Sequence, residues 1–288
     1  MSLKMFQPPE KQERRSTIRA THIIAIAAGK GGVGKSSVTV NLAIALKRAG
    51  YAVGVMDADI YGPSIRRMLP ENTMPSQKGE TITPALSNGI RVISMAYFRQ
   101  ANEATAVRAP IANGVISQFI KNVDWGPLDF LLIDFPPGTG DIQLTLSQQA
   151  NLTGALMVTT PQEVAIMDVR KAVHLFDQVN VPIIGIVENM SYFQSNTNQE
   201  RHYLFGQGGG ERLSSEIGVP FLGNIPIDPE ICRCGDEGQP LSIQGADLSP
   251  AAQAFAQLAE NFVAHVTALQ RISSECLTSF DLPLKEMK

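Results

Sequence analysis

Short apolar runs and longer amphipathic stretches alternate along the chain from Ile23 onward. Most runs are apolar on both alternating faces, as strands are when helices cover both sides of a parallel sheet. We predict strands at residues 23–28, 52–56, 90–95, 130–133, 155–160, 182–187 and 221–226. This rhythm is typical of βαβ units and predicts an α/β fold with a doubly wound, mostly parallel sheet flanked by helices.

The stretches between the strands predict helices and two irregular segments. Apolar residues at helical spacing indicate helices at about 36–49, 162–179, 208–217 and 250–269. Residues 70–89, rich in Pro, Gly and polar side chains, predict an extended excursion. Residues 191–207 are polar and follow a strand at the sheet edge where ligands bind in open α/β folds.

The pattern also predicts the domain organisation. Residues 17–270 form one domain of the predicted α/β type, because their strands and helices alternate without a break. Residues 1–16 are polar and lack periodicity, so we expect a flexible N-terminal arm. Residues 271–288 form a C-terminal tail of mixed charge.

Composition narrows the class of protein. The chain has 288 residues, 44% hydrophobic and 18% charged, with a net charge of -3. Such a charge gives no overall attraction to DNA or to an anionic membrane. Three cysteines and no secretory signal pattern favour a reducing compartment, so we expect a cytoplasmic protein.

The strongest motif follows the first predicted strand. Residues 29–37 read GKGGVGKSS and satisfy the G-x-x-x-x-G-K-[ST] phosphate-binding pattern between a strand and a helix. The backbone N–H groups of such a loop surround phosphate oxygens, its lysine contacts the β and γ phosphates, and its serine binds Mg²⁺. The predicted nucleotide-binding residues here are Gly29, Lys30, Gly31, Gly32, Val33, Gly34, Lys35, Ser36 and Ser37. From the residues alone, Lys30 is either a second phosphate ligand or a solvated surface charge.

Acidic residues follow two other predicted strands. Asp134 ends the run FLLID before the turn PPGTGD, a position suited to the Mg²⁺ shell of a P-loop ATPase. Asp57 and Asp59 in MDADIYGPS follow another strand and face the same sheet edge. One of them is suited to orienting the attacking water, and the alternative is that the pair caps a helix or solvates a loop.

Together these segments resemble a known family. The motifs GKGGVGKSS, DADIYGPS, DWGPLDFLLIDFPPGTGDIQLTLSQ, TTPQEVAIMDVRKA, ENMSYF, FGQGGG and GNIPID are similar to those of the Mrp group of ATP-binding iron-sulfur cluster carriers, within the MinD/ParA class with a deviant Walker A motif. The resemblance runs from about Thr17 to Leu241.

The resemblance implies a role for each matching residue. Lys30 would reach the nucleotide of a partner subunit, so that a homodimer encloses two ATP molecules. Lys30, Lys35 and Asp59 would be catalytic, with Asp59 positioning the water. Ser36, Asp57 and Asp134 would serve Mg²⁺. The adenine would lie against Asn189 and the loop from Pro226 to Asp228, and hydrolysis would be slow.

The chain departs from the family where the cluster ligands are expected. The family carries a C-x-x-C pair after ENMSYF, whereas Ser195 and Asn198 stand at those positions here. Serine and asparagine are weak ligands for cluster iron, so we expect no bridging cluster at this place. Cys232 and Cys234 form a C-x-C that we interpret as structural, and a relocated cluster site is the alternative. Cys276, His174 and His202 carry no predicted ligand role.

The leading hypothesis is therefore an ATPase that acts as an iron-sulfur cluster carrier or maturation factor. Its partners would be client apoproteins or iron-sulfur assembly proteins. A MinD/ParA-like positioning ATPase, or an ATP switch without a cluster, is the alternative, although no basic patch or basic amphipathic tail indicates DNA or membrane binding. A small-molecule enzyme that uses the same fold is a third possibility.

Overall fold

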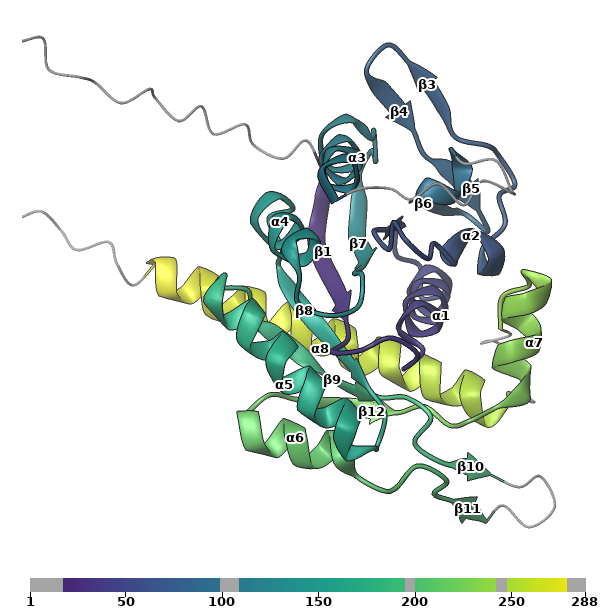
Figure 1. The fold of residues 1–288 in the computed structure, drawn as a ribbon, viewed down its shortest axis with the longest axis vertical. Coiled ribbons are helices and arrows are strands. Elements are labelled where there is room, and N and C mark those ends of the chain that lie inside the picture. Colours follow the sequence, from purple (N-terminus) through teal and green to yellow (C-terminus); the bar gives the residue numbers. More distant parts are fainter. Residues whose placement is uncertain (1–17, 99–108, 195–199, 242–247, 279–288) are drawn as a thin grey trace, which may run out of the picture.

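A computed structural model describes residues 18–98, 109–194, 200–241 and 248–278. Its core is an eight-stranded sheet in the order β12-β9-β8-β1-β7-β2-β6-β5 (Figure 1). Every neighbouring pair is parallel except β5 with β6. The strands are β1 (Ala20–Ala27), β2 (Val53–Asp57), β5 (Ala85–Ser87), β6 (Ile90–Ser94), β7 (Leu128–Asp134), β8 (Gly154–Thr159), β9 (Ile183–Glu188) and β12 (Phe221–Asn224).

Each predicted strand is present within a few residues of its expected bounds, and the predicted fold class is confirmed. The irregular segment 70–89 contributes β5 to the sheet edge and forms a separate hairpin of β3 (Ser76–Lys78) and β4 (Thr81–Thr83). A second small hairpin pairs β10 (Phe193–Gln194) with β11 (Arg201–His202).

Helices cover both faces of the sheet. The predicted ones are α1 (Lys35–Arg48), α5 (Glu163–Gln178), α6 (Gly209–Ile217) and α8 (Pro250–Thr278), and α8 continues past its expected end at 269. The sequence analysis missed α2 (Ile65–Met68), α3 (Ala109–Asn122), α4 (Asp141–Gln149), α7 (Pro229–Glu237) and the 3-10 turn η1 (Met95–Tyr97). No helix within the described residues has the length and apolarity that crossing a bilayer requires.

Two apolar clusters hold these helices to the sheet, and the helices lie on its two faces (Figure 1). On one face, α1 and α8 bury side chains such as Leu42, Leu46, Phe255 and Phe262. On the other face, α3, α4, α5 and α6 pack against the opposite side chains of the same strands. Each central strand is therefore buried on both sides, which explains why the strand sequences are continuously apolar.

The topology brings the polar ends of several strands to one edge of the sheet. Because the strands are parallel, the residues that follow β1, β2, β7 and β9 meet at the same carboxyl edge. Asp57 at the end of β2 lies directly beside Asp134 at the end of β7 in the strand register. The candidate site is built at this edge.

Candidate functional site

The phosphate-binding loop connects β1 to α1 in a tight turn. Gly34 has φ of 80° and directly precedes the helix. A Cβ atom on Gly34 would lie 2.2 Å from the Asn189 amide nitrogen, and one on Gly29 would lie 2.1 Å from the backbone of Asp168 in α5. A side chain at either position would collide with these neighbours, so the glycines permit the close packing of loop, α5 and Asn189.

Asp134 is the buried centre of the site. Its carboxylate lies 2.7 Å from Lys35 Nζ. It also accepts hydrogen bonds from Ser36 Oγ at 2.7 Å and Thr39 Oγ1 at 2.8 Å. A fully buried carboxylate requires such partners, because an unpaired charge is costly in a low-dielectric interior. The structure thus brings Lys35 and Ser36 to Asp134, whereas the sequence analysis missed Thr39, one helical turn after Lys35.

Asp57 is a second buried carboxylate at the same edge. It accepts hydrogen bonds from Ser94 Oγ at 2.9 Å and from the Ile65 backbone N–H at 3.3 Å. Burial and, after it, the negative charge of Asp134 raise the pKa of Asp57 to about 7, while the Ser94 hydrogen bond, the Lys35 charge and the Ile65 backbone hydrogen bond oppose the rise. The Ile65 contact shows that Asp57 also supports the start of α2.

The two carboxylates and Ser36 fit a magnesium site. Carboxylate and hydroxyl oxygens are ligands that Mg²⁺ prefers, alongside waters and nucleotide phosphates. A divalent cation near Asp57 and Asp134 would remove the like-charge repulsion that helps to raise the Asp57 pKa. No group of three or more His, Cys, Asp or Glu residues able to hold a metal occurs in the described part of the chain.

Asp59 lies in the loop that follows β2. Its Oδ1 accepts a hydrogen bond from the Gly62 backbone N–H at 3.2 Å, and its own N–H donates to Asp57 Oδ1 at 3.2 Å. Asp59 is half-buried and lines the cavity described next. The two aspartates therefore differ in environment, one being deep in the sheet edge and the other facing the open space.

A cavity of about 800 Å³ lies above this sheet edge. Asn189, after β9, donates from its side chain to the Val33 carbonyl of the phosphate-binding loop at 2.9 Å. The predicted site residues that line the cavity are Lys30, Gly31, Gly32, Gly34, Lys35, Ser36, Ser37, Asp59, Asn189, Pro226 and Asp228. Its wall also includes residues that sequence reasoning missed: Arg67, Met68, Met190, Leu204, Phe205, Ile231, Asp236 and Gln239.

Cys232 and Cys234 both lie on α7 and line the same cavity. Cys232 is exposed, and Cys234 is buried in the core that packs under α1 and α8. Burial raises the pKa of the Cys234 thiol, which disfavours the thiolate that cluster iron requires. Residues two apart on a helix point roughly 200° apart. The two side chains therefore leave α7 in different directions, although both line the cavity. Ser195 and Asn198 lie outside the described residues.

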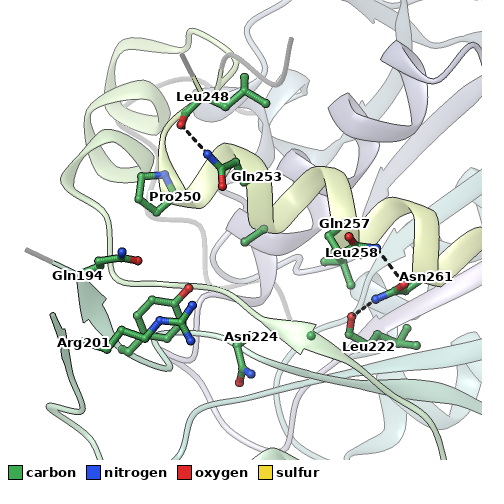
Figure 2. Close-up of a pocket in the computed structure, with 13 residues that line it drawn as sticks. Gln194, Arg201, Leu222, Asn224, Leu248, Pro250, Gln253, Gln257, Leu258 and Asn261 are labelled. Carbon is green, nitrogen blue, oxygen red and sulfur yellow. Dashed lines mark hydrogen bonds between the residues drawn. The ribbon is translucent and has the colours of Figure 1, made fainter. Parts of the chain in front are cut away.

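A second cavity of about 790 Å³ lies between the β10–β11 hairpin, β12 and α8 (Figure 2). Amide side chains line much of it, and two of them bond the backbone: Gln253 donates to the Leu248 carbonyl and Asn261 to that of Leu222. Arg201 stacks over the Tyr192 ring, with 4.3 Å between the guanidinium carbon and the ring centre. None of the predicted site residues lines this space.

The strand, glycine loop and helix, with a lysine, a serine and two carboxylates at their junction, define a P-loop NTPase. Comparison with known proteins then specifies the family. A family model of NUBPL iron-transfer P-loop NTPases, in the ParA group, matches residues 19–263. The chain belongs to this family.

Relatives and solved structures agree with that assignment. The chain is 43% identical to an iron-sulfur cluster carrier protein of Synechocystis sp. over 88% of this chain and 74% of the relative. It is 45% identical to one of Methanocaldococcus jannaschii over 83% of each. A nucleotide-binding protein of Archaeoglobus fulgidus, solved with ADP, is similar at 39% identity and a TM-score of 0.68, over 77% of this chain and 88% of that one. The cell division ATPase MinD of Pyrococcus furiosus, at 24% identity, shares the fold (TM-score 0.61, 85% and 99% covered).

The raised pKa of Asp57 predicts a pH dependence in magnesium-free and nucleotide-free buffer. From about pH 4 to 7 the unfolded chain ionises this group while the folded chain retains its proton, so the free energy of unfolding falls as pH rises. Asp57→Asn lacks this titration. Between pH 5 and 7 we expect the free energy of unfolding, measured with denaturant, to fall by about 2–3 kcal/mol more in the wild type than in the variant. Parallel curves for the two proteins would contradict the buried, protonated state.

Proposed function

We propose that this protein binds and slowly hydrolyses ATP as a homodimer and acts in the carriage of iron-sulfur clusters or the maturation of cluster proteins. The observation that carries the proposal is the joined set of Lys35, Ser36 and Asp134 at the base of the 800 Å³ cavity. Its family membership supplies the link to iron-sulfur clusters. Client apoproteins and assembly proteins in the cytoplasm are the proposed partners.

Hydrolysis would be an in-line attack of water on the γ-phosphoryl group. Asp59 faces the cavity and would orient that water, while Lys35 and Lys30 would stabilise charge on the phosphate oxygens. Ser36, Asp57 and Asp134 would hold Mg²⁺ or its water shell. When bound, the ion would neutralise phosphate charge. Asn189 and the loop from Pro226 to Asp228 would enclose the adenine.

The surface beside the cavity supports an ATP-dependent dimer. Leu204 lines the cavity and exposes 62% of its surface, and Val164 and Met167 on the adjoining helix α5 expose 64% and 54%. Exposed apolar side chains of this size next to a ligand site favour association. Lys30 lines the same cavity and would reach the nucleotide of the second copy.

An iron-sulfur cluster would not be held by the C-x-x-C pair that the resemblance implies. Ser195 and Asn198 stand where the resemblance places the paired cysteines, and on α7 Cys232 is exposed whereas Cys234 is buried. We therefore propose that the isolated chain works as an ATP switch in cluster maturation. A cysteine-bearing relative in a heterodimer would be one route to cluster carriage.

Lys35→Ala tests the phosphate site. Removing the ammonium deletes a charge-assisted contact to phosphate, so the affinity for a fluorescent ATP analogue is expected to fall at least tenfold, or about 1.4 kcal/mol. Lys47→Ala, near the end of the same helix, is the matched control and should bind as the wild type does. Full ATP binding and hydrolysis by the Lys35 variant would refute the P-loop assignment.

Lys30→Ala tests the dimer. The variant should remain a folded monomer and should lose the mass increase that the wild type shows with ATP in size-exclusion chromatography with light scattering. A charged contact across an interface contributes enough for this loss. Lys78→Ala, on the distant β3 strand, should dimerise normally. If the Lys30 variant dimerises with ATP as the wild type does, the proposed contact of Lys30 across the interface is refuted.

Anaerobic reconstitution with iron and sulfide tests the cargo proposal. The wild type alone should bind no stoichiometric cluster, as measured by iron, labile sulfide and visible absorption. The double substitution Ser195→Cys and Asn198→Cys should gain one, because thiolates are the protein ligands of such clusters. A stoichiometric wild-type cluster that disappears in a Cys232→Ser, Cys234→Ser variant would instead establish a site on α7.

A further inference from the structure

The start of α6 has no cap from its own sequence. The helix begins at Gly209, and Gly208 at the N-cap position makes no side-chain hydrogen bond to the first turn. Backbone N–H groups in a first helical turn need partners, because no intrahelical carbonyl is available to them. The segment just before this helix contains Leu204 and Phe205, which form part of the nucleotide cavity wall. The position of that wall therefore depends on what holds the helix start.

Glu188, at the end of β9, supplies the missing cap from a different element. Its side chain is fully buried, and its Oε2 accepts a hydrogen bond from the Gly210 N–H at 2.6 Å. Its Oε1 accepts a second from Ser191 Oγ at 2.6 Å. A carboxylate at a helix N-terminus is favoured both by the hydrogen bond and by the positive end of the helix dipole.

The glycine run at the helix start permits this contact. A Cβ atom on Gly210 would lie 3.0 Å from Glu188 Cβ, and one on Gly209 would lie 2.5 Å from the Pro161 carbonyl oxygen. Only a residue without a side chain lets the helix start approach both β9 and Pro161 so closely. The glycines of the FGQGGG motif thus let the start of α6 pack against Glu188, the glutamate of ENMSYF.

The neighbouring residue ties the same strand end to the phosphate-binding loop. Asn189 donates to the Val33 carbonyl at 2.9 Å. Met190 follows with φ of 54°, a conformation that costs a non-glycine residue energy, and it also lines the cavity. Glu188 and Asn189 are adjacent in sequence, and between them they hold the Leu204–Phe205 wall and the P-loop.

We propose that Glu188 is a positioning residue for nucleotide binding, which acts by capping α6 and thereby placing the Leu204–Phe205 wall against the cavity. Glu188 is fully buried and does not line the cavity, so it would act through α6 and not on the nucleotide directly. The inference rests on the proposed binding of ATP, and it assigns a role to a residue of the ENMSYF motif that does not line the cavity.

Glu188→Gln tests the inference, since the amide keeps the size of the side chain and removes its charge. The Kd for a fluorescent ATP analogue is expected to rise about five- to tenfold, and KM for ATP should rise with kcat changed less than twofold. Amide hydrogen exchange should accelerate in residues 203–212 and stay unchanged in the strands. Glu211→Gln, which neutralises an exposed glutamate in the first turn of the same helix, is the matched control and should match the wild type.

Two further variants cover the case in which Glu188→Gln does not fold. Ser191→Ala removes one of the two hydrogen bonds, and Gly210→Ala pushes the helix start away from Glu188; each should raise the Kd severalfold. Wild-type Kd and unchanged exchange at residues 203–212 in the variants that fold would overturn the role of Glu188. Failure of the unaltered chain to bind the analogue would instead overturn the proposed function, and the inference with it.

Discussion

The buried carboxylate of Asp134 links the central strand β7 to the start of α1. It lies at the end of β7 with no exposed surface, so its charge must be balanced from within the protein. Lys35, Ser36 and Thr39 provide that balance, and all three belong to the first turns of α1. The P-loop is thereby attached to the central strand by ionic and hydrogen-bonded contacts, in addition to the apolar packing beneath α1.

The same contacts are suited to a response to nucleotide. In the structure, Lys35 is paired with Asp134, and the residue beside Asp134 in the sheet register is the protonation-prone Asp57. Phosphate and Mg²⁺ would compete for all three groups. Two hydrogen bonds connect these groups to neighbouring elements: the Ile65 N–H at the start of α2 donates to Asp57, and Asn189 donates to the P-loop carbonyl of Val33.

Residues at the end of β9 extend these contacts to α6, which follows the cavity wall along the chain. Glu188 and Asn189 make contacts to α6 and to the P-loop from consecutive positions, and Ser191 continues the network toward β12. The β10–β11 hairpin follows directly along the chain, and the resemblance to the Mrp group implies cluster-ligand positions at residues 195 and 198 between its strands. The contacts of Glu188 and Asn189 therefore lie only a few residues before the positions at which the resemblance implies cluster ligands.

The sequence by itself determined the parallel sheet, the P-loop and the acidic residues at its edge, because continuous apolar strands and a motif with strict spacing are local signals. Local signals also existed for α7, with Asp228 as N-cap, Pro229 in the first turn and Gly238 after the end, yet its short apolar face gave no clear periodicity. Only the tertiary structure decided that Thr39 completes the Asp134 cluster, that α7 lines the cavity and that Glu188 caps α6. These contacts join residues that lie on different elements, and in the case of Glu188 and Gly210 they are 22 positions apart. Their geometry depends on how the strands are ordered in the sheet, which no short stretch of sequence specifies.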